Sequence, residues 1–423
     1  MYKEVPGNKH INQHYYEECF VISRKVLQEG SEFAMKILLT SDWYLPAVNG
    51  VVTSIMNLKK GLQARGHDVK ILTLSFRARS YTCQDVVYIG SVDVGMIYPC
   101  ARLRVALARK EVQELLEWGP DVVHSNCEFS TYFLAHEIAR KLNIPLIHTY
   151  HTVYQDYTHY FAPNRMIGQR IAREFSRWTA GRAQAVIAPT AKVAEILRGY
   201  DLNNSIYVVP TGIDAGRLQP LHEEERQKQR QQLGISAGHT VLLYLGRLAH
   251  EKNCQELIRA MVPLKGRPVT LLLVGDGPAR KELEQLACTL NVEQQVVFAG
   301  MVPPEQVGEY YALGDLFVSA SVSEAQGLTY AEALLAGLPL LCRRDGCLND
   351  IIVNGENGWQ YQTVDEFVKR VEWFCANPYF RQRARSCAKQ QSKRFTVEAF
   401  AASVEQVYKQ QQAMLHCYKK VIA

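Results

Sequence analysis

The chain of 423 residues is 47% hydrophobic and 21% charged, a balance typical of a globular protein and a length that favours two domains over one core. Its formal net charge of +6 is too small and too dispersed to indicate nucleic-acid binding. The eleven cysteines form no Cys-x-x-Cys pair, and Cys127, Cys254 and Cys342 fall inside expected core elements. We therefore expect reduced thiols rather than a disulfide framework.

Residues 1–34 are polar and have no clear period, so we expect them to be an appendage outside the core. The first apolar run, 35–40, predicts a buried parallel strand. A loop follows, and then a helix from about residue 53 to 66. Further strands are expected at 69–74, 86–89, 122–125, 146–150, 185–188 and 206–209, and helices at 110–118, 132–143, 165–182 and 191–199. This alternation is typical of βαβ units in a doubly wound parallel sheet.

A second alternation begins after a polar stretch at 221–232. Its expected strands are 241–245, 269–274, 296–298, 316–318, 338–342 and 358–361, with helices between them. The sequence thus predicts an α/β protein of two Rossmann-like, doubly wound domains, 35–214 and 215–396, that face each other across a cleft. Ligands of such sheets bind beyond the carboxyl ends of the strands. A last helix, within 397–423, is expected to cross back to the first domain.

Residues 319–333 join an expected strand to an expected helix through a loop of small and polar residues with one glycine, Gly327. Free backbone N–H groups at such a helix start, together with the helix dipole, favour a phosphate. Glu324 and Glu332 flank the turn, eight positions apart. Because carboxylates repel phosphate, they suit the neutral hydroxyl groups of a ribose and a hexose instead. This stretch therefore suggests a nucleotide-sugar site.

A basic loop follows the first strand of the second half. Arg247 and Lys252 stand five positions apart, where the loop turns into a helix. Two cations at the carboxyl edge of a sheet can bind a diphosphate and stabilise it further as it leaves and gains charge. Taken alone, the Arg-x-x-x-x-Lys pattern could be a solvated basic loop. The presence of the 319–333 turn in the same half favours a diphosphate site.

Three other places carry weaker signals. Asn49-Gly50-Val51 precedes a helix, where a glycine lets the backbone approach a phosphate or a sugar, or simply forms a turn. His151 falls at the end of a strand, facing the expected cleft, and a purely structural histidine is the alternative. The glycines of 275–277 favour a structural turn over a nucleotide loop.

The segment 165–182 is basic and amphipathic. Its apolar residues, Trp178 among them, recur at mostly helical spacings, and its one acid is Glu174. Its five arginines are Arg165, Arg170, Arg173, Arg177 and Arg182. A basic helix with aromatic residues suits an anionic membrane surface, whereas the alternative is a helix packed on the sheet with a solvated basic face.

The sequence argues against several other chemistries. It has no Asp-x-Asp pair and no cluster with zinc-ligand spacing, so no metal is expected. It also has no Ser/His/Asp hydrolase elbow. Two Rossmann-like halves would fit an NAD(P)-dependent oxidoreductase, but that class requires Gly-x-Gly-x-x-Gly after the first strand, and the loop there has Gly50 alone.

Taken in order over two Rossmann-like halves, these motifs resemble the retaining family-four glycosyltransferases of the GT-B fold. The resemblance runs from Met35 to about residue 410, with the E-x7-E pattern at Glu324 and Glu332. Within that family, 150–160 and 323–330 look like the bacterial diacylglycerol glucosyltransferases. Gln326 departs from the family pattern, which usually has an aromatic residue there.

The resemblance implies roles for these residues. Glu324 would hold hydroxyls of the donor hexose, Glu332 would hold the ribose, and His151 would touch the donor sugar. The implied catalytic set is His151, Arg247, Lys252 and Glu324, and the donor-binding set adds Gly50, Val302, Gln326, Gly327, Leu328, Thr329 and Glu332. Retention would proceed by front-face attack, in which a phosphate oxygen takes the acceptor's proton, so no protein nucleophile is needed.

The resemblance also implies substrates and a cellular place. The enzyme would move a hexose, glucose above all, from UDP-glucose or another UDP-hexose to a membrane glycerolipid such as diacylglycerol or monoglucosyldiacylglycerol. Domain 35–214 would bind the acceptor and 215–396 the nucleotide sugar, with no cofactor and no nucleic acid. We expect a cytoplasmic protein held peripherally on the anionic inner face of the cell membrane. The alternative acceptor is a polysaccharide or another non-lipid molecule, used by an enzyme of the same family. A different class, a non-catalytic membrane-surface protein, would not need Arg247, Lys252, Glu324 and Glu332, so their presence argues against it.

Overall fold

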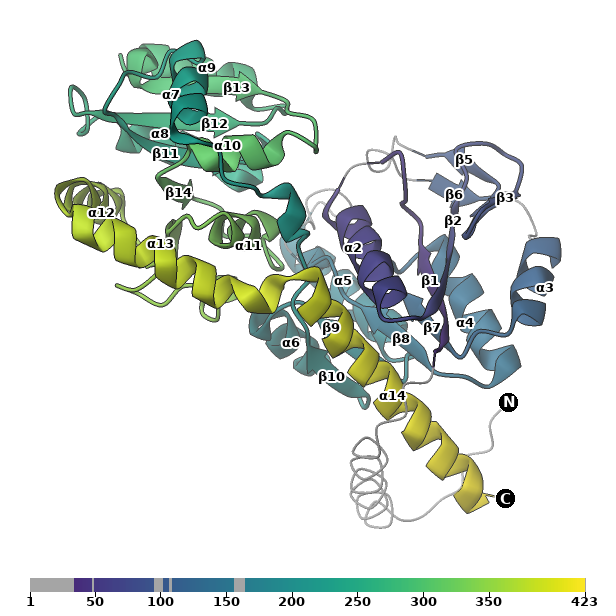
Figure 1. Cartoon of the computed structure of the whole chain (residues 1–423). Coiled ribbons are helices and arrows are strands. Elements are labelled where there is room, and N and C mark those ends of the chain that lie inside the picture. The colour runs from purple at the N-terminus through teal and green to yellow at the C-terminus, as the bar shows by residue number, and fades with distance from the viewer. Residues whose placement is uncertain (1–33, 48, 95–101, 106–108, 156–163, 423) are drawn as a thin grey trace. The chain divides into compact units, whose positions relative to one another are not determined.

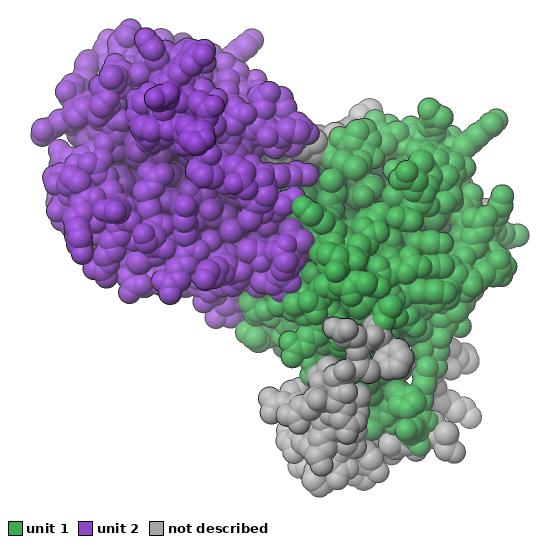
Figure 2. Space-filling view, viewed as in Figure 1, with its two compact units in different colours: residues 1–188, 196–209, 401–423 green, residues 189–195, 210–400 purple. Residues whose placement is uncertain are grey.

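The structure is a computed structural model, and it describes residues 34–47, 49–94, 102–105, 109–155 and 164–422. The chain divides into two compact units, each built around its own sheet (Figure 1, Figure 2). The first unit holds 1–188, 196–209 and 401–423, and the second holds 189–195 and 210–400. Residues 1–33 of the expected appendage lie outside the described part of the chain.

The first unit contains an eight-stranded sheet with the order β10-β9-β8-β7-β1-β2-β4-β3. Its strands are β1 (Lys36–Ser41), β2 (Asp68–Leu74), β3 (Tyr81–Cys83), β4 (Val86–Ile89), β7 (Val122–Ser125), β8 (Leu146–Thr149), β9 (Ala185–Ala188) and β10 (Ser205–Val208). Neighbouring strands pair in parallel, except β3, which runs antiparallel to β4. A separate antiparallel pair is formed by β5 (Ser91–Asp93) and β6 (Arg102–Arg104).

Helices connect these strands. They are α2 (Gly50–Ala64), α3 (Arg109–Trp118), α4 (Ser130–Leu142) and α5 (Arg165–Ala180). Two further helices pass from the second unit into the first, α6 (Ala191–Arg198) and the long α14 (Val397–Ile422) that ends the chain (Figure 1). No described helix is both long and apolar enough to cross a lipid bilayer.

The second unit contains a six-stranded, wholly parallel sheet with the order β13-β12-β11-β14-β15-β16. Its strands are β11 (Thr240–Leu245), β12 (Val269–Val274), β13 (Val296–Gly300), β14 (Leu316–Ser319), β15 (Leu340–Arg343) and β16 (Gly358–Tyr361). Its helices are α7 (Glu223–Gln232), α8 (Cys254–Ala260), α9 (Arg280–Thr289), α10 (Val307–Leu313), α11 (Leu328–Leu335), α12 (Val364–Ala376) and α13 (Pro378–Ser392). Short 3-10 turns are η2 (Ala215–Arg217), η3 (His250–Lys252), η4 (Glu293–Gln295), η5 (Gly346–Leu348) and η6 (Lys393–Phe395).

Both faces of the second sheet are covered, which explains why its strands are apolar throughout. Leu242 and Tyr244 of β11 belong to one hydrophobic cluster, whereas Val241 and Leu243 belong to another. Successive side chains of a strand point to opposite faces, so the two clusters are the cores on the two sides of the sheet. The same burial explains the run Ile37 to Leu39 in β1, whose side chains are fully buried.

Each sheet has one place where the strand order reverses. In the first sheet it lies between β1 and β7, and in the second it lies between β11 and β14. The connections leave such a pair of strands toward opposite sides, and this opens a crevice at the carboxyl ends of the strands where ligands bind. The loops after β11 and β14 therefore flank the place where a ligand of the second sheet would bind.

The sequence located the parallel strands but missed some local features. The short strands β3, β5 and β6 have too few residues to give a period. The helix α2 begins at Gly50 rather than near Thr53, because the Asn49 side chain accepts a hydrogen bond from Val52 N and so caps the helix three residues earlier. The expected division after residue 214 falls after 209, and residues 189–195 group with the second unit.

Glu405 ties α14 to the rest of the first unit. Its carboxylate accepts a hydrogen bond from Arg65, the residue that ends α2, and Lys409 Nζ lies 2.6 Å from Glu405 Oε1. Burial by itself would raise the pKa of Glu405, but the bonds from Lys409 and Arg65 outweigh burial and lower that pKa to about 2.

We expect Glu405→Gln to lower the free energy of unfolding by about 1–3 kcal/mol at neutral pH, because charge-assisted hydrogen bonds are lost. The folded pKa lies below the unfolded value of 4.5, so this stabilisation is fully present above pH 4.5 and is lost as the pH falls toward about 2. Urea unfolding at pH 7 and pH 3 should show the smaller difference between the two proteins at pH 3. Glu174→Gln, at an exposed position on α5, is the matched control, and a difference that does not depend on pH would contradict the assignment.

Candidate functional site

The loop after β14 turns sharply before α11 begins. Gly327 adopts a left-handed backbone with φ of 70° as the residue before α11. A Cβ atom at this position would lie 2.4 Å from the Tyr330 ring, so only glycine fits. The turn leaves the first N–H groups of α11, which begins at Leu328, at the carboxyl edge of the sheet. Thr329 follows in the first turn and, like Leu328, is partly buried.

Lys252 and Glu324 meet at the point where the strand order reverses. Lys252 Nζ lies 2.5 Å from Glu324 Oε1, and Ser321 Oγ donates to the same oxygen at 2.9 Å. The Lys252 and Glu324 side chains are 20% and 18% exposed, so both groups remain accessible to a ligand. The structure therefore brings together two residues that are 72 positions apart in the chain.

Arg247 lies two residues beyond the end of β11. Its backbone oxygen accepts from Tyr244 Oη at 3.1 Å, which fixes the backbone of this loop. The Arg247 side chain is exposed, and within the described residues it makes no ion pair. An exposed guanidinium in the loop that also carries Lys252 is available to an anionic ligand.

Glu332 lies in α11, where Tyr311 Oη of α10 donates to its Oε2 at 2.6 Å. Burial raises the pKa of Glu332, and the hydrogen bond from Tyr311 opposes that rise. Val302, which follows β13, is partly buried against the same hydrophobic cluster as Tyr311. The roles expected for Glu332 and Val302 stay predictions.

The Gln326 side chain has a structural task that the sequence did not reveal. Its Oε1 accepts from Thr211 N at 2.8 Å, and its Nε2 donates to Thr211 O at 3.2 Å. The side chain is buried, and it makes with the Thr211 backbone the same pair of hydrogen bonds that a residue of a neighbouring strand would make. Only the main chain of Gln326 is therefore left to contact a ligand.

The glycines of 275–277 serve backbone packing. A Cβ atom at Gly275 would lie 2.0 Å from Gly246 O, and one at Gly277 would lie 2.3 Å from Leu248 O. The loops after β11 and β12 can thus touch only because these side chains are absent. Leu248 N donates to Asp276 O at 2.9 Å across the same contact. This packing explains the glycines as a structural turn that supports the Arg247 loop.

The sequence did not predict that Thr190 and Lys192 hold the loop of Glu324. Lys192 Nζ donates to Glu324 O at 3.2 Å and to both carboxylate oxygens of Asp345 at 2.9 Å. Thr190 Oγ1 donates to Ala325 O at 2.8 Å. Asp345 follows β15 at the same edge of the sheet, a position that could have drawn attention to it. Lys192 lies more than a hundred residues earlier, and no sequence pattern connects the two.

His151 of the first unit lies in the loop after β8. Its Nε2 donates to Asn126 Oδ1 at 3.0 Å. Burial lowers the pKa of His151 to about 4, and the charge of Glu128 opposes this shift only in part. His151 is therefore neutral at pH 7 and can act through hydrogen bonds but not as a cation. Gly50 is exposed at the start of α2, and its expected approach to a ligand stays a prediction.

Glu128 is a buried carboxylate near His151 that the sequence analysis missed. Tyr154 Oη donates to Glu128 Oε2 at 2.6 Å, and His148 Nε2 lies 3.4 Å from Glu128 Oε1. Asn126 and Glu128, both just beyond β7, thus hold the loop of His151 and Tyr154 from one side. The loops after β7 and β8 thus carry hydrogen-bonding groups, and Asp42, which follows β1, accepts hydrogen bonds from Ser130 N and Thr131 N.

The expected basic face of α5 is present on the first unit. Arg170 and Arg177 are exposed, and Arg173 pairs with Asp201 at 3.0 Å. The exposed large apolar residues of this helix and its surroundings are Met166, Ile167, Ile171, Trp178, Phe129 and Phe133. Arg165 begins α5, but its side chain lies outside the described part of the structure. Cations and uncovered apolar side chains thus share one helix.

Among the described residues, no group of three His, Cys, Asp or Glu side chains lies close enough to hold a metal ion. Cys127, Cys254 and Cys342 are buried free thiols, as the core positions of these cysteines predicted.

Solved structures similar to this chain identify the fold as GT-B. Anabaena Alr3699/HepE in complex with UDP-glucose has a TM-score of 0.68 and 21% identity and covers 88% of this chain and 99% of its own. WaaG, a glycosyltransferase involved in lipopolysaccharide biosynthesis, has a TM-score of 0.65 and 18% identity and covers 88% of this chain and 99% of its own. The expected α/β fold of two Rossmann-like halves is confirmed.

Comparisons of sequence identify the family. The model of Glycosyltransferase Family 4 matches residues 48–217, and that of Glycosyl transferases group 1 matches 225–391. An alpha-monoglucosyldiacylglycerol synthase of Acholeplasma laidlawii is 32% identical over 88% of this chain and 96% of its own. One of Streptococcus pneumoniae is 35% identical over 75% of this chain and 73% of its own. The chain belongs to glycosyltransferase family four and is a sugar-transferring enzyme.

We expect Lys192→Met to lower the turnover of sugar transfer by about 10- to 100-fold, because a loop released from its anchor misplaces Glu324. The substitution also leaves Asp345 buried without its cation, which reduces stability. Lys192→Met combined with Asp345→Asn removes that charge, so it should recover the melting temperature but not the turnover. Recovery of both in the double variant would show that Lys192 serves stability alone.

Proposed function

We propose that this glycosyltransferase moves glucose from UDP-glucose to a membrane glycerolipid, diacylglycerol or monoglucosyldiacylglycerol, with retention of the anomeric configuration. The observation that carries the donor half of this proposal is the contact of Lys252 with Glu324 at the strand-order reversal of the second sheet, with Arg247 in the same loop as Lys252. The acceptor half is supported by the two relatives above, whose names state a monoglucosyldiacylglycerol product.

The donor is proposed to bind with its diphosphate beside Arg247 and Lys252. Both cations lie in the loop after β11, and the free N–H groups at the start of α11 add hydrogen-bond donors for the phosphates. Glu324 would then exchange its contact with Lys252 for hydroxyls of the hexose. The proposed ribose ligand is Glu332, and the proposed uracil contact is the main chain of Val302.

The Lys252–Glu324 pair supports this proposal on physical grounds. Without a ligand, each charge neutralises the other, so neither has to be buried alone. When a diphosphate binds, its negative charge attracts Lys252 and repels Glu324, and the carboxylate turns to the neutral hydroxyls. Lys252 is then free to contact the leaving diphosphate. Its attraction for the diphosphate grows as the bond to the sugar breaks, because the diphosphate gains negative charge.

The proposed route to retention needs no protein nucleophile. The acceptor hydroxyl attacks from the face that the diphosphate leaves, and a phosphate oxygen takes its proton. His151 is neutral at pH 7 because burial lowers its pKa to about 4, so it would orient the donor sugar through a hydrogen bond. Asn126, which accepts from Nε2, fixes the ring for that task.

The membrane half of the proposal rests on α5. Met166 is 78% exposed and Ile167 is 56% exposed, which is unusual for large apolar side chains, and they share the helix with Arg170 and Arg177. Such a helix can insert its apolar side chains among lipid tails while its arginines contact anionic head groups. We therefore propose peripheral attachment to the cytoplasmic face of the membrane.

A non-lipid acceptor is the second candidate, because other relatives carry names of that kind. A putative teichuronic acid biosynthesis glycosyltransferase of Bacillus subtilis is 29% identical over 59% of this chain, and a 2-deoxystreptamine glucosyltransferase of Streptomyces kanamyceticus is 29% identical over 56%. Both cover less of this chain than the glycolipid synthases do.

Purified protein is incubated with radiolabelled UDP-glucose and vesicles that contain either diacylglycerol or monoglucosyldiacylglycerol. Diacylglycerol should yield a labelled lipid with one hexose, and monoglucosyldiacylglycerol should yield a labelled lipid with two. UDP-galactose and GDP-mannose, tested in parallel, report the donor. Glu324→Gln should reduce turnover by about 100- to 1000-fold, the range for one preorganised contact to the transition state. Label found only in water-soluble products would favour the non-lipid acceptor, and full activity of Glu324→Gln would remove that residue from the site.

Replacing Arg170, Arg173 and Arg177 by glutamine should weaken sedimentation with phosphatidylglycerol vesicles by about tenfold or more, since each basic residue contributes about 1 kcal/mol near an anionic surface. Binding to phosphatidylcholine vesicles should change little. The control replaces the exposed cations Arg259, Lys265 and Lys281 of the second unit. Equal losses in both triple variants would mean that net charge, not α5, controls attachment.

A further inference from the structure

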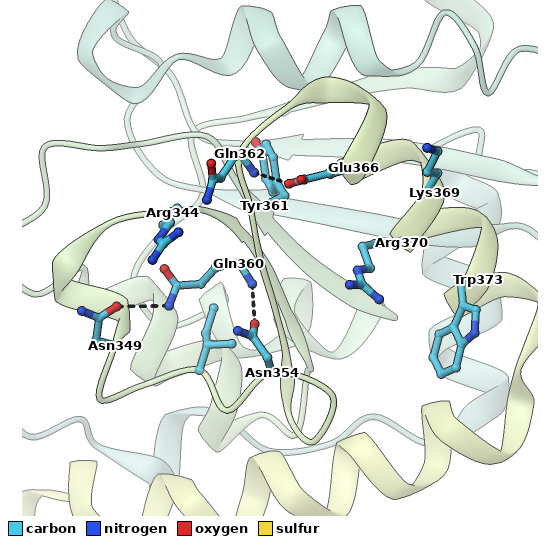
Figure 3. Close-up of a pocket in the computed structure, with 11 residues that line it drawn as sticks. Arg344, Asn349, Asn354, Gln360, Tyr361, Gln362, Glu366, Lys369, Arg370 and Trp373 are labelled. Carbon is cyan, nitrogen blue, oxygen red and sulfur yellow. Dashed lines mark hydrogen bonds between the residues drawn. The ribbon is translucent and has the colours of Figure 1, made fainter.

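The second unit also has a pocket of about 810 Å³. Its walls are the loop after β15, strand β16 with its flanking residues, and α12 (Figure 3). The sheet order β11-β14-β15-β16 puts β16 at the edge of the sheet, two strands from β14. None of the residues proposed to bind the sugar donor lines this pocket.

The pocket carries an excess of positive charge. Arg344, Lys369 and Arg370 line it together with a single carboxylate, Glu366, so three cations face one anion. Glu366 Oε2 accepts from Gln362 N at 2.7 Å, which directs that carboxylate to the start of α12. The side chains of Arg344 and Lys369 are exposed and have no ion-pair partner among the described residues. An anion in this pocket would therefore gain charge pairing without displacing an existing one.

Polar amides beside these cations are already fixed in place. Gln360 Nε2 donates to Asn349 Oδ1 at 3.4 Å, and Gln360 N donates to Asn354 Oδ1 at 2.9 Å (Figure 3). Gln360 Oε1 also accepts from Asp345 N at 3.3 Å. Amides have both donors and acceptors, so those of this group suit hydroxyls, which need both.

An aromatic ring closes the opposite side of the pocket. Trp373 is 42% exposed, yet it is fixed by edge contacts with Trp359, 5.4 Å away between ring centroids, and with Phe380, 4.7 Å away. An exposed ring held by other rings loses little entropy when a ligand packs on it. Its face suits the C–H groups of a sugar or a glycerol.

We propose that this pocket binds a phosphorylated polyol, with the phosphate held by the cations that line it, hydroxyls at the amides and the carbon skeleton against Trp373. The volume lies within the range of small-molecule sites. The ligand chemistry has two sources, a free sugar or glycerol phosphate and the phosphoglycerol head group of an anionic lipid. The assignment does not depend on the proposed reaction, because it uses residues outside the donor site.

The test is calorimetric titration of the full-length protein with glycerol 3-phosphate and glucose 6-phosphate, with glycerol as the uncharged comparison. One series contains saturating UDP, which fills the proposed donor site. An ester that binds at the donor site rather than in the pocket would then no longer bind. The wild-type protein should bind a phosphate ester in both series, and Arg344→Gln with Lys369→Gln should weaken that binding at least tenfold. The matched control is Lys265→Gln with Lys281→Gln, two exposed cations elsewhere in the unit. All four substituted residues are exposed, and a melting curve confirms that each variant folds.

Vesicle binding distinguishes the two sources. Loss of sedimentation with phosphatidylglycerol vesicles in the Arg344/Lys369 variant, and not in the control, identifies the lipid head group. Unchanged sedimentation with weakened ester binding identifies a free phosphate ester. The proposal is overturned if neither ester nor vesicle binding differs between the two double variants, or if UDP abolishes ester binding and the vesicles show no difference.

Discussion

The pairing of Lys252 with Glu324 is the interaction on which the site of the second unit depends. It forms where the strand order reverses between β11 and β14, because the connections from these strands leave to opposite sides and their loops face one open edge. A carboxylate and an ammonium at that edge would each lose hydration if they stood alone, whereas together they hold one another in place. The pair thus keeps two oppositely charged groups ready for a ligand that carries both phosphates and hydroxyls.

This pair is supported by backbone packing around it. Gly275 and Gly277 let the loop after β12 contact the loop that carries Arg247, since any side chain there would overlap Gly246 or Leu248. On the other side, Lys192 holds the carbonyl of Glu324 and is itself held by Asp345. A site whose loops are fixed from two directions loses little entropy on binding and keeps its groups within the small displacements that catalysis tolerates.

The two units present different electrostatics at equivalent places in their sheets. The second unit has a cation and a carboxylate in contact at its switch point. The first unit has His151, Asn126 and Tyr154 in the loops after β7 and β8. Its carboxylates at this edge, Asp42 and Glu128, already accept hydrogen bonds from within the unit. Burial lowers the pKa of His151 to about 4, so this imidazole is neutral at pH 7 and acts through hydrogen bonds. The exposed apolar residues of α5 belong to the same unit, which agrees with a proposed acceptor that resides in a membrane.

The sequence by itself determined the two parallel sheets and most of their strands, because buried parallel strands are apolar throughout and βαβ units alternate regularly. It also singled out Arg247, Lys252, Glu324 and Glu332 as candidates, since each lies in a loop beyond a strand or in the helix that follows one. It could not find Lys192, Asp345 or Glu128, nor the task of the Gln326 side chain, because their partners lie far away in the chain and carry no shared pattern. Which of the residues at an edge touch one another is set by strand order and loop packing, and only the tertiary structure decides those.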